Sequence, residues 1–354
     1  MAIRTLQIDA PRAGELLVRL VATGVCHTDA TMWAQGVPVP QPVVLGHEGA
    51  GIVEAIGADV TGIAVGDHVV MSYNSCGTCP SCADDAQSYC YEFFPRNFFG
   101  TRPDGSTALA ELDGSPVHAN IFGQSSFATH AICHERNAVV VSKDVDLRIA
   151  GPLGCGVMTG AGAVMKALQV RSGQSVVVLG AGSVGLSAVM AAAAVGAAHI
   201  VAVDLNADRL TLAQELGATL TILASTVDSV AAVLSAIPGG VDYAIDCTGL
   251  PKVIEQGIAM LAPRGTCGIV GAAGPGTMFQ ADVSHVMSGG RVVRGIVEGD
   301  ADPKTFIPEL VALHAAGRFP FDRLITYYPF DQINQAFADS HDGTAVKPVL
   351  LFDG

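Results

Sequence analysis

The sequence predicts an α/β protein with two domains, one rich in β-structure and one built on a doubly wound parallel sheet. Its 354 residues suit two domains, and half of them are hydrophobic, which is ample for two cores. Short β-rich runs broken by Gly and Pro fill residues 1 to about 155. From about Pro152, strands alternate with Ala-rich helical segments, a pattern typical of a parallel sheet with helices on both faces.

The first region shows no long helical period. We expect an antiparallel, loop-rich arrangement with strands at residues 43–45, 51–55 and 68–72. Residues 91–124 are irregular and contain Phe93, Phe94, Phe98, Phe99 and Phe122. This aromatic stretch is either a packed surface loop or the wall of a pocket, and the sequence favours neither.

The second region has a regular alternation of elements. Strands are predicted at residues 175–179, 199–203, 241–246 and 266–270, with helices at 184–195, 208–216 and 252–261. After about Arg294 the pattern reverts to mixed short elements, so the chain is expected to return to its first domain. The predicted division is a first domain at 1–156, a second at 157–295 and the return at 296–354.

Composition and charge exclude several classes of protein. The net charge is −14 and no Lys-rich or Arg-rich run interrupts it, so nucleic acid is not an expected partner. The longest apolar stretch, residues 184–198, is shorter than the roughly 20 residues of a membrane-spanning helix and is interpreted as a buried helix.

The nine cysteines indicate a reducing compartment. Met1 is not followed by a charged and then apolar leader, and a chain of this size does not need disulfide bonds for stability. We therefore expect a cytoplasmic protein whose thiols are free for metal. Three of them, Cys133, Cys247 and Cys267, have no assigned role and are predicted to be buried core residues.

Four cysteines fall in one short loop at intervals of three, three and eight: Cys76, Cys79, Cys82 and Cys90. This spacing lets four thiolates converge on a tetrahedral Zn²⁺. The loop is rich in Gly, Pro, Ser and Asp, and a closed Cys₄ site would supply the stability that its low apolar content cannot. The alternative is four free thiols in a mobile loop, which the Cys-x-x-Cys repeats disfavour.

Gly180, Gly182 and Gly185 form Gly-x-Gly-x-x-Gly directly after the predicted strand 175–179 and open the helix that follows. Three such glycines alone are a weak signal, but their position between strand and helix makes the signal strong. The first permits a tight turn, the second lets a pyrophosphate approach the backbone, and the third lets helix and strand pack closely. The helix N-terminus would bind the phosphates.

Asp204 ends the next predicted strand. A carboxylate here would accept hydrogen bonds from the adenosine ribose and repel the 2′-phosphate of NADP, so the sequence favours NAD. The alternative for Asp204 is an ordinary helix N-cap. Arg209 lies one loop further on and either touches the same ribose, pairs with Glu215 or faces solvent.

Cys26, His47 and Cys155 remain as a second possible ligand set. Two thiolates and one imidazole would leave the fourth position of a zinc open for water or substrate, as a catalytic zinc requires. The three residues are far apart in the sequence, however, and a lone His between glycines is more often a turn residue. The residues alone leave both interpretations open.

The chain resembles the zinc-containing medium-chain alcohol dehydrogenases over almost its whole length. The resemblance is carried by Gly-His-Glu-Gly-Ala-Gly at 46–51, the four-cysteine loop and the glycine motif. It implies a GroES-like first domain, a Rossmann second domain and two zinc ions per subunit. It also implies that Cys26, His47 and Cys155 bind the catalytic zinc, that Glu48 lies near it, and that Asp29 orients the ligand imidazole.

Five stretches, at 92–97, 124–128, 152–162, 297–300 and 319–322, are similar to the aryl (benzyl) alcohol dehydrogenase branch. This implies hydride transfer from a primary aromatic or allylic alcohol to NAD⁺, giving the aldehyde, and the reverse. Bacterial dehydrogenases for geraniol or perillyl alcohol share much of the pattern, and a glutathione-dependent formaldehyde dehydrogenase is a further alternative. A non-catalytic nucleotide-binding structural or regulatory protein is the alternative outside enzymes.

The resemblance assigns further positions. Thr28 matches a hydroxyl that hydrogen-bonds the zinc-bound oxygen, and Thr31 stands where many relatives place a basic His. His27 and Lys347 match positions near the pyrophosphate, although either residue could simply face solvent.

Val184 and Val270 are expected beside the cofactor. Candidate walls of the substrate pocket are Trp33, Val37, Tyr73, Phe93, Phe94 and Phe99. Family members are homodimers or homotetramers joined through the nucleotide domain, so one of these assemblies is expected.

Overall fold

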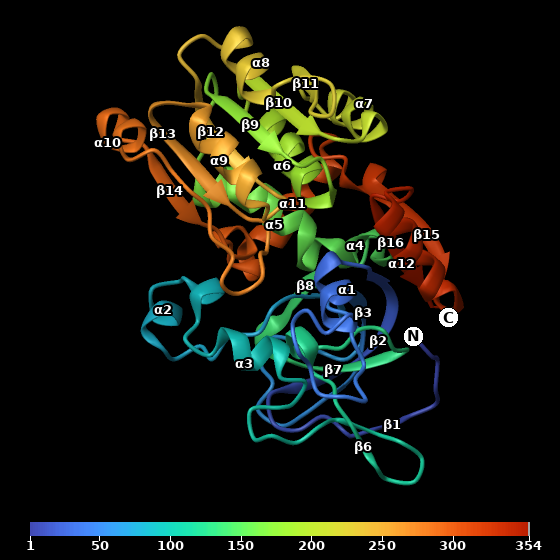
Figure 1. Cartoon of the computed structure of the whole chain (residues 1–354). Helices are drawn as coiled ribbons and strands as arrows, with labels where there is room; N and C mark the ends of the chain where they lie inside the picture. Colours follow the sequence, from blue (N-terminus) through green and yellow to red (C-terminus); the bar gives the residue numbers. More distant parts are fainter. Residues whose placement is uncertain (353–354) are drawn as a thin grey trace. The chain divides into compact units, whose positions relative to one another are not determined.

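The computed structural model describes residues 1–352, which form two compact units (Figure 1). The first unit comprises Met1–Cys155, Asp302–Ala312 and Asp322–Gly354, and the second comprises Gly156–Ala301 and Leu313–Phe321. The first break in the chain therefore lies next to the division predicted at residue 156. Residues 313–321 belong to the second unit, which the sequence did not indicate.

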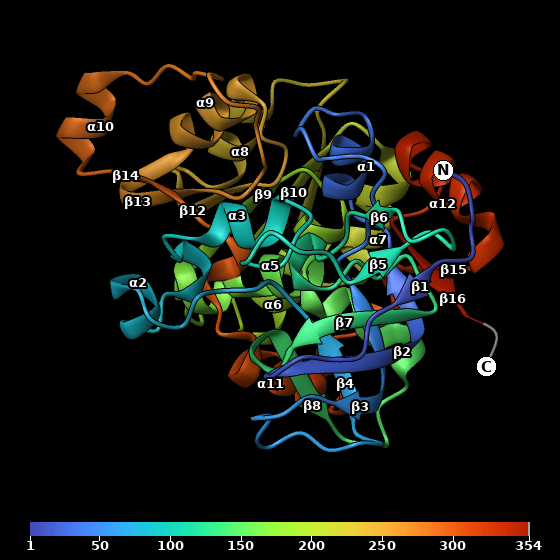
Figure 2. The ribbon, with the colours of Figure 1, turned by 90° about the horizontal axis from the view of Figure 1, so that it is seen from below.

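The first unit is built on a seven-stranded sheet in the order β15-β16-β2-β3-β4-β8, with β7 also paired to β2. All pairs in this sheet are antiparallel except β15 with β16, and Figure 2 shows β7 lying alongside β2. The strands of this unit, including the small sheet β1-β5-β6, are β1 (Gln7–Ile8), β2 (Glu15–Gly24), β3 (Gly49–Ile56), β4 (His68–Met71), β5 (Leu109–Ala110), β6 (Pro116–Val117), β7 (His130–His134), β8 (Ala138–Val141), β15 (Ile325–Pro329) and β16 (Lys347–Leu351).

The core of this unit follows the period-two alternation of its strands. Leu16, Val18 and Leu20 of β2 are buried on one face, where they pack with Val53 and Val69 from the neighbouring strands. The strands predicted at 51–55 and 68–72 are confirmed as β3 and β4. The strand predicted at 43–45 is wrong, because Val43 makes only an isolated bridge to His118.

Helical segments occupy the connections of the first unit. They are α1 (His27–Trp33), α2 (Pro80–Ala83), α3 (Phe93–Phe98), α4 (Leu147–Ala150), α11 (Pro303–Ala315), which ends in the second unit, and α12 (Ile333–Asp342), with short 3₁₀ turns that include η2 (Ile121–Gly123) and η4 (Gly151–Gly154). The stretch 91–124 is thus partly ordered by α3, β5, β6 and η2. The elements after Arg294 are longer than expected, since α11 has 13 residues.

The second unit holds a parallel six-stranded sheet in the order β11-β10-β9-β12-β13-β14. This is the doubly wound order with its switch point between β9 and β12, and the predicted fold class is confirmed. The elements are β9 (Ser175–Leu179), β10 (His199–Asp204), β11 (Leu220–Leu223), β12 (Val241–Asp246), β13 (Leu261–Ile269), β14 (Val292–Gly295), α5 (Gly156–Gly162), α6 (Ser183–Ala194), α7 (Ala207–Glu215), α8 (Ser229–Ala236), α9 (Pro251–Ala259) and α10 (Val283–Gly289).

Buried aliphatic residues hold this sheet to its helices. Val177 and Val201 form a core with Val233 of α8 and with Ile254 and Ile258 of α9. The apolar stretch that begins at residue 184 forms α6, a buried helix as predicted. Over residues 1–352, we find no helix with both the length and the apolar character that crossing a membrane demands.

The cysteines without a predicted role are divided between the units. Cys133 on β7 and Cys267 on β13 are buried in the cores, as expected. Cys247 is only partly buried, so the prediction of a core thiol is wrong there.

Candidate active site

Four side chains from three separate segments converge in the first unit. Cys26 stands between β2 and α1, His47 and Glu48 precede β3, and Cys155 follows η4. One ligand atom from each lies within 4.8 Å of the others. The fold therefore brings together the three ligands that the resemblance implied, with the Glu48 carboxylate beside them.

Asp29 ties two of these segments together. Its Oδ1 accepts hydrogen bonds from the Gly46 backbone N–H at 3.0 Å and from His47 Nδ1 at 2.9 Å, and its Oδ2 accepts from the Cys26 N–H at 3.2 Å. Asp29 and His47 are fully buried. Because a carboxylate only accepts, Nδ1 of His47 carries the proton and Nε2 offers its lone pair, as expected of an orienting acid.

The donor atoms of this cluster suit a zinc ion. His47 Nε2 is buried and has no hydrogen-bond partner, an arrangement that a metal would satisfy. The hydrogen bond from Cys155 holds the pKa of Cys26 well below its ordinary value, with help from His47, although burial opposes this. A low pKa favours the thiolate, which is the form that binds Zn²⁺.

Lys347 lies inside this site rather than at the surface. Its Nζ donates to Glu48 Oε1 at 2.8 Å, to Glu48 Oε2 at 3.0 Å and to the Val25 carbonyl at 3.2 Å. Burial would lower its pKa, but the Glu48 carboxylate outweighs this and holds the pKa of Lys347 above its ordinary value. The alternative that Lys347 faces solvent is therefore wrong, whereas its contact with the pyrophosphate stays a prediction.

The first turn of α1 carries the other predicted polar residues. His27 is exposed, and Thr28 is partly buried two positions after Cys26. The Thr31 hydroxyl donates to the His27 carbonyl at 3.0 Å, so its hydrogen bond is made to the backbone of α1 itself. The roles of His27 and Thr28 remain predictions.

Aromatic rings extend from His47 into the stretch 91–124. Phe122 stacks on the His47 imidazole with ring centres 4.4 Å apart and planes 23° apart, although its φ of +50° is unusual for a side chain of this size. Phe122 also contacts Phe98 at 5.1 Å and Phe93 at 6.4 Å. The aromatic stretch therefore packs on itself and also reaches the ligand cluster.

The candidate pocket walls separate into two groups. Tyr73 packs on Phe93, and Phe94 contacts both Phe98 and Phe99, so these rings belong to the aromatic cluster around Phe122. Trp33, in contrast, packs edge-on against Phe337 of α12. Only the first group is linked to His47 through ring contacts within residues 1–352.

The four-cysteine loop forms a second cluster. One atom from each of Cys76, Cys79, Cys82 and Cys90 lies within 4.8 Å of the others. The Cys76 sulfur accepts from the backbone N–H of Thr78 at 3.4 Å and of Cys79 at 3.2 Å. Although burial opposes it, these bonds lower the pKa of Cys76 to about 6, and four converging sulfurs fit the predicted structural zinc.

The glycine motif of the second unit has the geometry that a dinucleotide requires. Gly180 has a φ of +96° and makes the turn, and a Cβ on Gly185 would lie 1.9 Å from the Gly180 carbonyl oxygen, which requires close packing. A Cβ on Gly182 would meet nothing within 4 Å, so its backbone faces open space at the N-cap of α6. This open backbone is where a pyrophosphate would approach.

Asp204 borders this turn. Its Oδ2 accepts from the Ala181 N–H at 2.6 Å and its Oδ1 from the Asn206 N–H at 2.8 Å. Asn206 caps α7, so the helix-cap alternative for Asp204 is wrong. Arg209 is partly buried and its Nε has no partner, which leaves it available to a ligand.

The two valines expected beside the cofactor follow β9 and β13, at the carboxyl ends of these parallel strands. Val184 is in the first turn of α6, and Val270 follows β13 and donates its N–H to the Asp246 carbonyl at 2.9 Å. Both are partly buried. Their contact with a cofactor stays a prediction.

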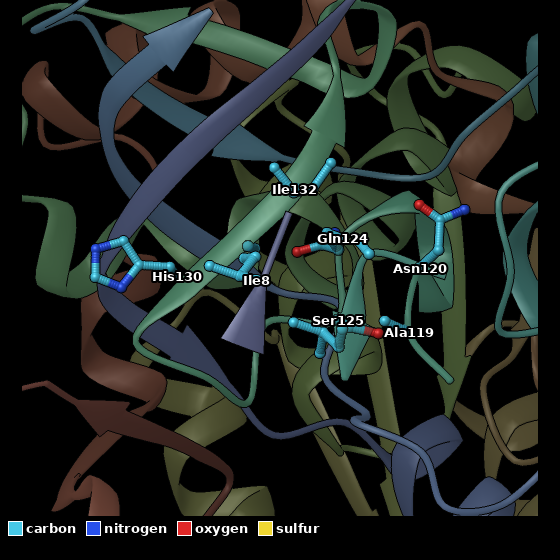
Figure 3. A pocket seen from close by; sticks show the side chains of 10 residues that line it. Ile8, Ala119, Asn120, Gln124, Ser125, His130 and Ile132 are labelled. Carbon is cyan, nitrogen blue, oxygen red and sulfur yellow. The ribbon is translucent and has the colours of Figure 1, made fainter. Parts of the chain in front are cut away.

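A small cavity in the first unit lies apart from this chemistry. Figure 3 shows it between Ile8, Ile132, Gln124 and Ser125, with His130 at its margin. None of the predicted ligands lines it. We therefore do not assign it to substrate.

Sequence reasoning missed two features of the site. The burial of Lys347 depends on β16, which pairs Val349 with Gly24 of β2 and so places Lys347 beside Val25. The amide of Gln124 donates to the His47 carbonyl at 2.8 Å. Gln124 stands in a stretch that resembles aryl alcohol dehydrogenases, but nothing in the sequence indicates its contact with a ligand segment.

Comparison with known proteins agrees with this geometry. Residues 12–143 match the alcohol dehydrogenase GroES-like domain and residues 183–315 match the zinc-binding dehydrogenase family. A geraniol dehydrogenase from Castellaniella defragrans is 48% identical, with 99% of this chain and 94% of that protein covered.

Two solved structures are similar throughout. Benzyl alcohol dehydrogenase from Acinetobacter calcoaceticus has a TM-score of 0.96 and 49% identity, covering 99% of this chain and 95% of that chain. An alcohol dehydrogenase zinc-binding domain protein from Burkholderia ambifaria has a TM-score of 0.98 and 54% identity, covering 100% and 95%.

Proposed function

Because this chain belongs to the zinc-containing alcohol dehydrogenase family, we propose that it oxidises primary aromatic or allylic alcohols to aldehydes with NAD⁺ and catalyses the reverse reduction. The row of aromatic rings that starts on the His47 imidazole and continues through Phe122 to Phe98 carries this proposal. Apolar aromatic surface beside the ligands would bind rings and isoprenoid chains better than ethanol. Similarity to geraniol and benzyl alcohol dehydrogenases supports the same substrate class.

Different residues of the first unit would bind the metal, orient its ligand and transfer the proton. When bound, zinc supplies Lewis acidity toward the alcohol oxygen and NAD⁺ accepts the hydride. Cys26, His47 and Cys155 would hold the metal, and Asp29 keeps His47 Nε2 aimed at it through the bond to Nδ1. The Thr28 hydroxyl would accept the alcohol proton at Oγ1 and pass its own to solvent, since Thr31 is not a base.

A substrate panel tests the proposal. Benzyl alcohol, geraniol, perillyl alcohol and ethanol are compared with formaldehyde plus glutathione, and NADH absorbance gives kcat/KM for each. We expect the aromatic and allylic alcohols to exceed ethanol by roughly 10- to 200-fold, the range that apolar pocket contacts provide. A preference for ethanol or for the glutathione adduct would overturn the substrate class.

The NAD preference is tested at Asp204. Asp204→Ala removes the charge that would repel a 2′-phosphate and an acceptor for the ribose hydroxyls, worth about 1.5–3 kcal/mol. We expect the ratio of kcat/KM for NAD⁺ over NADP⁺ to fall by roughly tenfold or more.

Two further variants separate charge from turn geometry at this site. Asp204→Asn removes the charge and keeps one oxygen to accept from the Ala181 N–H, while the amide nitrogen cannot replace the acceptor for the Asn206 N–H. Asp228→Ala removes the N-cap of α8 in the same unit and should leave the ratio unchanged. An unchanged ratio in both Asp204 variants would exclude the ribose role.

The assembly and compartment are also part of the proposal. Val283 and Met287 of α10 are 77% and 74% exposed, and β14 is the edge strand beside them. This apolar surface supports a homodimer or homotetramer joined through the second unit, to be measured by light scattering. Nine free cysteines support a cytoplasmic location.

A further inference from the structure

Two buried side chains connect the segment that carries His47 to the segment that carries Cys155. Gln124 follows η2 and is 2% exposed, and Ser72 follows β4 and is fully buried. We propose that Gln124 and Ser72 are positioning residues for the catalytic metal, which hold these two ligands at the required spacing. The inference rests on the ligand set of the proposed function.

The Gln124 side chain hydrogen-bonds the backbone on both sides of Glu48. Its Nε2 donates to the His47 carbonyl at 2.8 Å, and its Oε1 accepts from the Gly49 N–H at 3.0 Å. The second hydrogen on Nε2 serves the Ser72 carbonyl at 3.4 Å. Both donors of the amide are therefore used, and the backbone that follows the ligand imidazole is held by a side chain from a distant segment.

Ser72 continues the connection to the third ligand. Its hydroxyl donates to the Gly154 carbonyl at 2.6 Å, directly before Cys155. Its own backbone is held in turn, because its N–H donates to the Asn137 carbonyl at 2.9 Å. A continuous path of buried hydrogen bonds thus runs from His47 through Gln124 and Ser72 to the residue preceding Cys155.

The segments on this path pack closely against one another. A Cβ on Gly154 would lie 2.0 Å from the Met71 carbonyl oxygen, and a Cβ on Gly49 would lie 2.5 Å from the end of the Met71 side chain. Figure 3 shows Gln124 from the side of the small cavity, next to Ser125. Because Gln124 and Ser72 are buried and the backbones pack this closely, their side-chain hydrogen bonds help to set the distance between the two segments.

This distance matters because the ligands do not come from one short loop. Outer residues that orient ligands typically change metal affinity or activity by about 10- to 100-fold when they are lost. Loss of the Gln124–Ser72 connection should therefore loosen the catalytic metal and leave the metal of the four-cysteine cluster unchanged.

The test measures zinc release to a chelator with a colour indicator, and the absorption spectrum of Co²⁺-substituted enzyme. Gln124→Met removes the amide at similar volume, Gln124→Glu keeps an acceptor for Gly49, and Ser72→Ala removes the bond to Gly154. Ser126→Ala is the matched control. Ser126 lies in the same loop as Gln124, and its buried hydroxyl shares a hydrogen bond of 2.7 Å with the Thr23 hydroxyl on β2. Cys155→Ser identifies which zinc is the catalytic one.

The catalytic zinc is the one that is missing from Cys155→Ser. We expect Gln124→Met and Ser72→Ala to release this zinc roughly 10- to 100-fold faster than wild type does, and their Co²⁺ spectra to be shifted. The other zinc and the Ser126→Ala variant should behave as wild type. Wild-type release rates and spectra in Gln124→Met, Gln124→Glu and Ser72→Ala would overturn the inference, as would equal acceleration for both zincs. If Cys155→Ser keeps both zincs, the ligand assignment itself fails, which is a different result.

Discussion

The two clusters of candidate metal ligands in the first unit are built by different means. Cys76, Cys79, Cys82 and Cys90 lie in one loop, and backbone N–H groups of that loop bond their sulfurs. Cys26, His47 and Cys155 come from three segments, and the side chains of other residues hold them. The first cluster can form from local chain geometry, whereas the second requires the finished fold.

This difference explains why one cluster suits a structural role and the other a chemical one. Four sulfurs complete a tetrahedral shell and leave no position for a substrate. The second cluster has three candidate ligands, among them the unpartnered His47 Nε2, and a neighbouring Glu48 carboxylate that is paired with Lys347. A ligand set completed by distant residues can keep one position open without losing its shape.

The largest expected effect separates the two clusters directly. Cys155→Ser should lose one zinc per chain and lower kcat/KM by about 10³-fold or more, because several kcal/mol of electrophilic stabilisation disappear. Cys90→Ser should lose the other zinc and lower the thermal midpoint, while activity at low temperature survives. Elemental analysis, benzyl alcohol turnover and thermal unfolding measure the three quantities.

Circular dichroism provides the control for both variants. A Cys155→Ser variant with a native spectrum and wild-type turnover would contradict the assignment of the second cluster. A Cys90→Ser variant that keeps two zinc ions would contradict the assignment of the first.

A smaller effect is expected when the ligands stay and their support changes. Asp29→Asn leaves one oxygen to accept from three donors, because the amide nitrogen cannot accept from Gly46, His47 or Cys26. We expect the affinity of the catalytic zinc to fall by roughly 10- to 100-fold. Competition with a chelator measures this affinity.

The four-cysteine cluster is the internal control for Asp29→Asn. No Asp29 bond reaches that loop among the hydrogen bonds of residues 1–352, so its zinc should leave at the wild-type rate. Equal weakening of both metals would show a general loss of stability instead of a local change at His47.

The same contrast explains which parts of the molecule the sequence could predict. The four-cysteine loop and the glycine turn are local patterns, and both have the predicted geometry because short spacing determines it. The contacts of Lys347 and Phe122 depend on pairing between distant strands and on an unusual backbone angle, for which the sequence carries no local signal. The strand expected at 43–45 failed for a related reason, since Val43 pairs with His118, directly after β6, in a single isolated bridge that the local sequence does not indicate.

The smallest expected effect concerns a cysteine that belongs to neither cluster. Burial in the core of the first unit raises the pKa of Cys133 to about 12. In the unfolded chain a thiol ionises near pH 8.5, so the folded state binds the extra proton above that pH. The stability due to this difference is complete below about pH 8.5 and is lost as the pH rises toward 12.

Replacing Cys133 by Ala should therefore flatten the alkaline loss of stability. Between pH 8 and pH 10.5 we expect the unfolding free energy of wild type to fall by on the order of 2 kcal/mol more than that of Cys133→Ala. Urea unfolding at the two pH values measures this difference, and Ser126→Ala, which removes a non-titrating buried hydroxyl, should fall in parallel with wild type. If the unfolding free energy of Cys133→Ala falls in parallel with that of wild type, the Cys133 thiol of the wild type does not ionise on unfolding in this pH range. The distinction between cluster thiols and core thiols would then not hold.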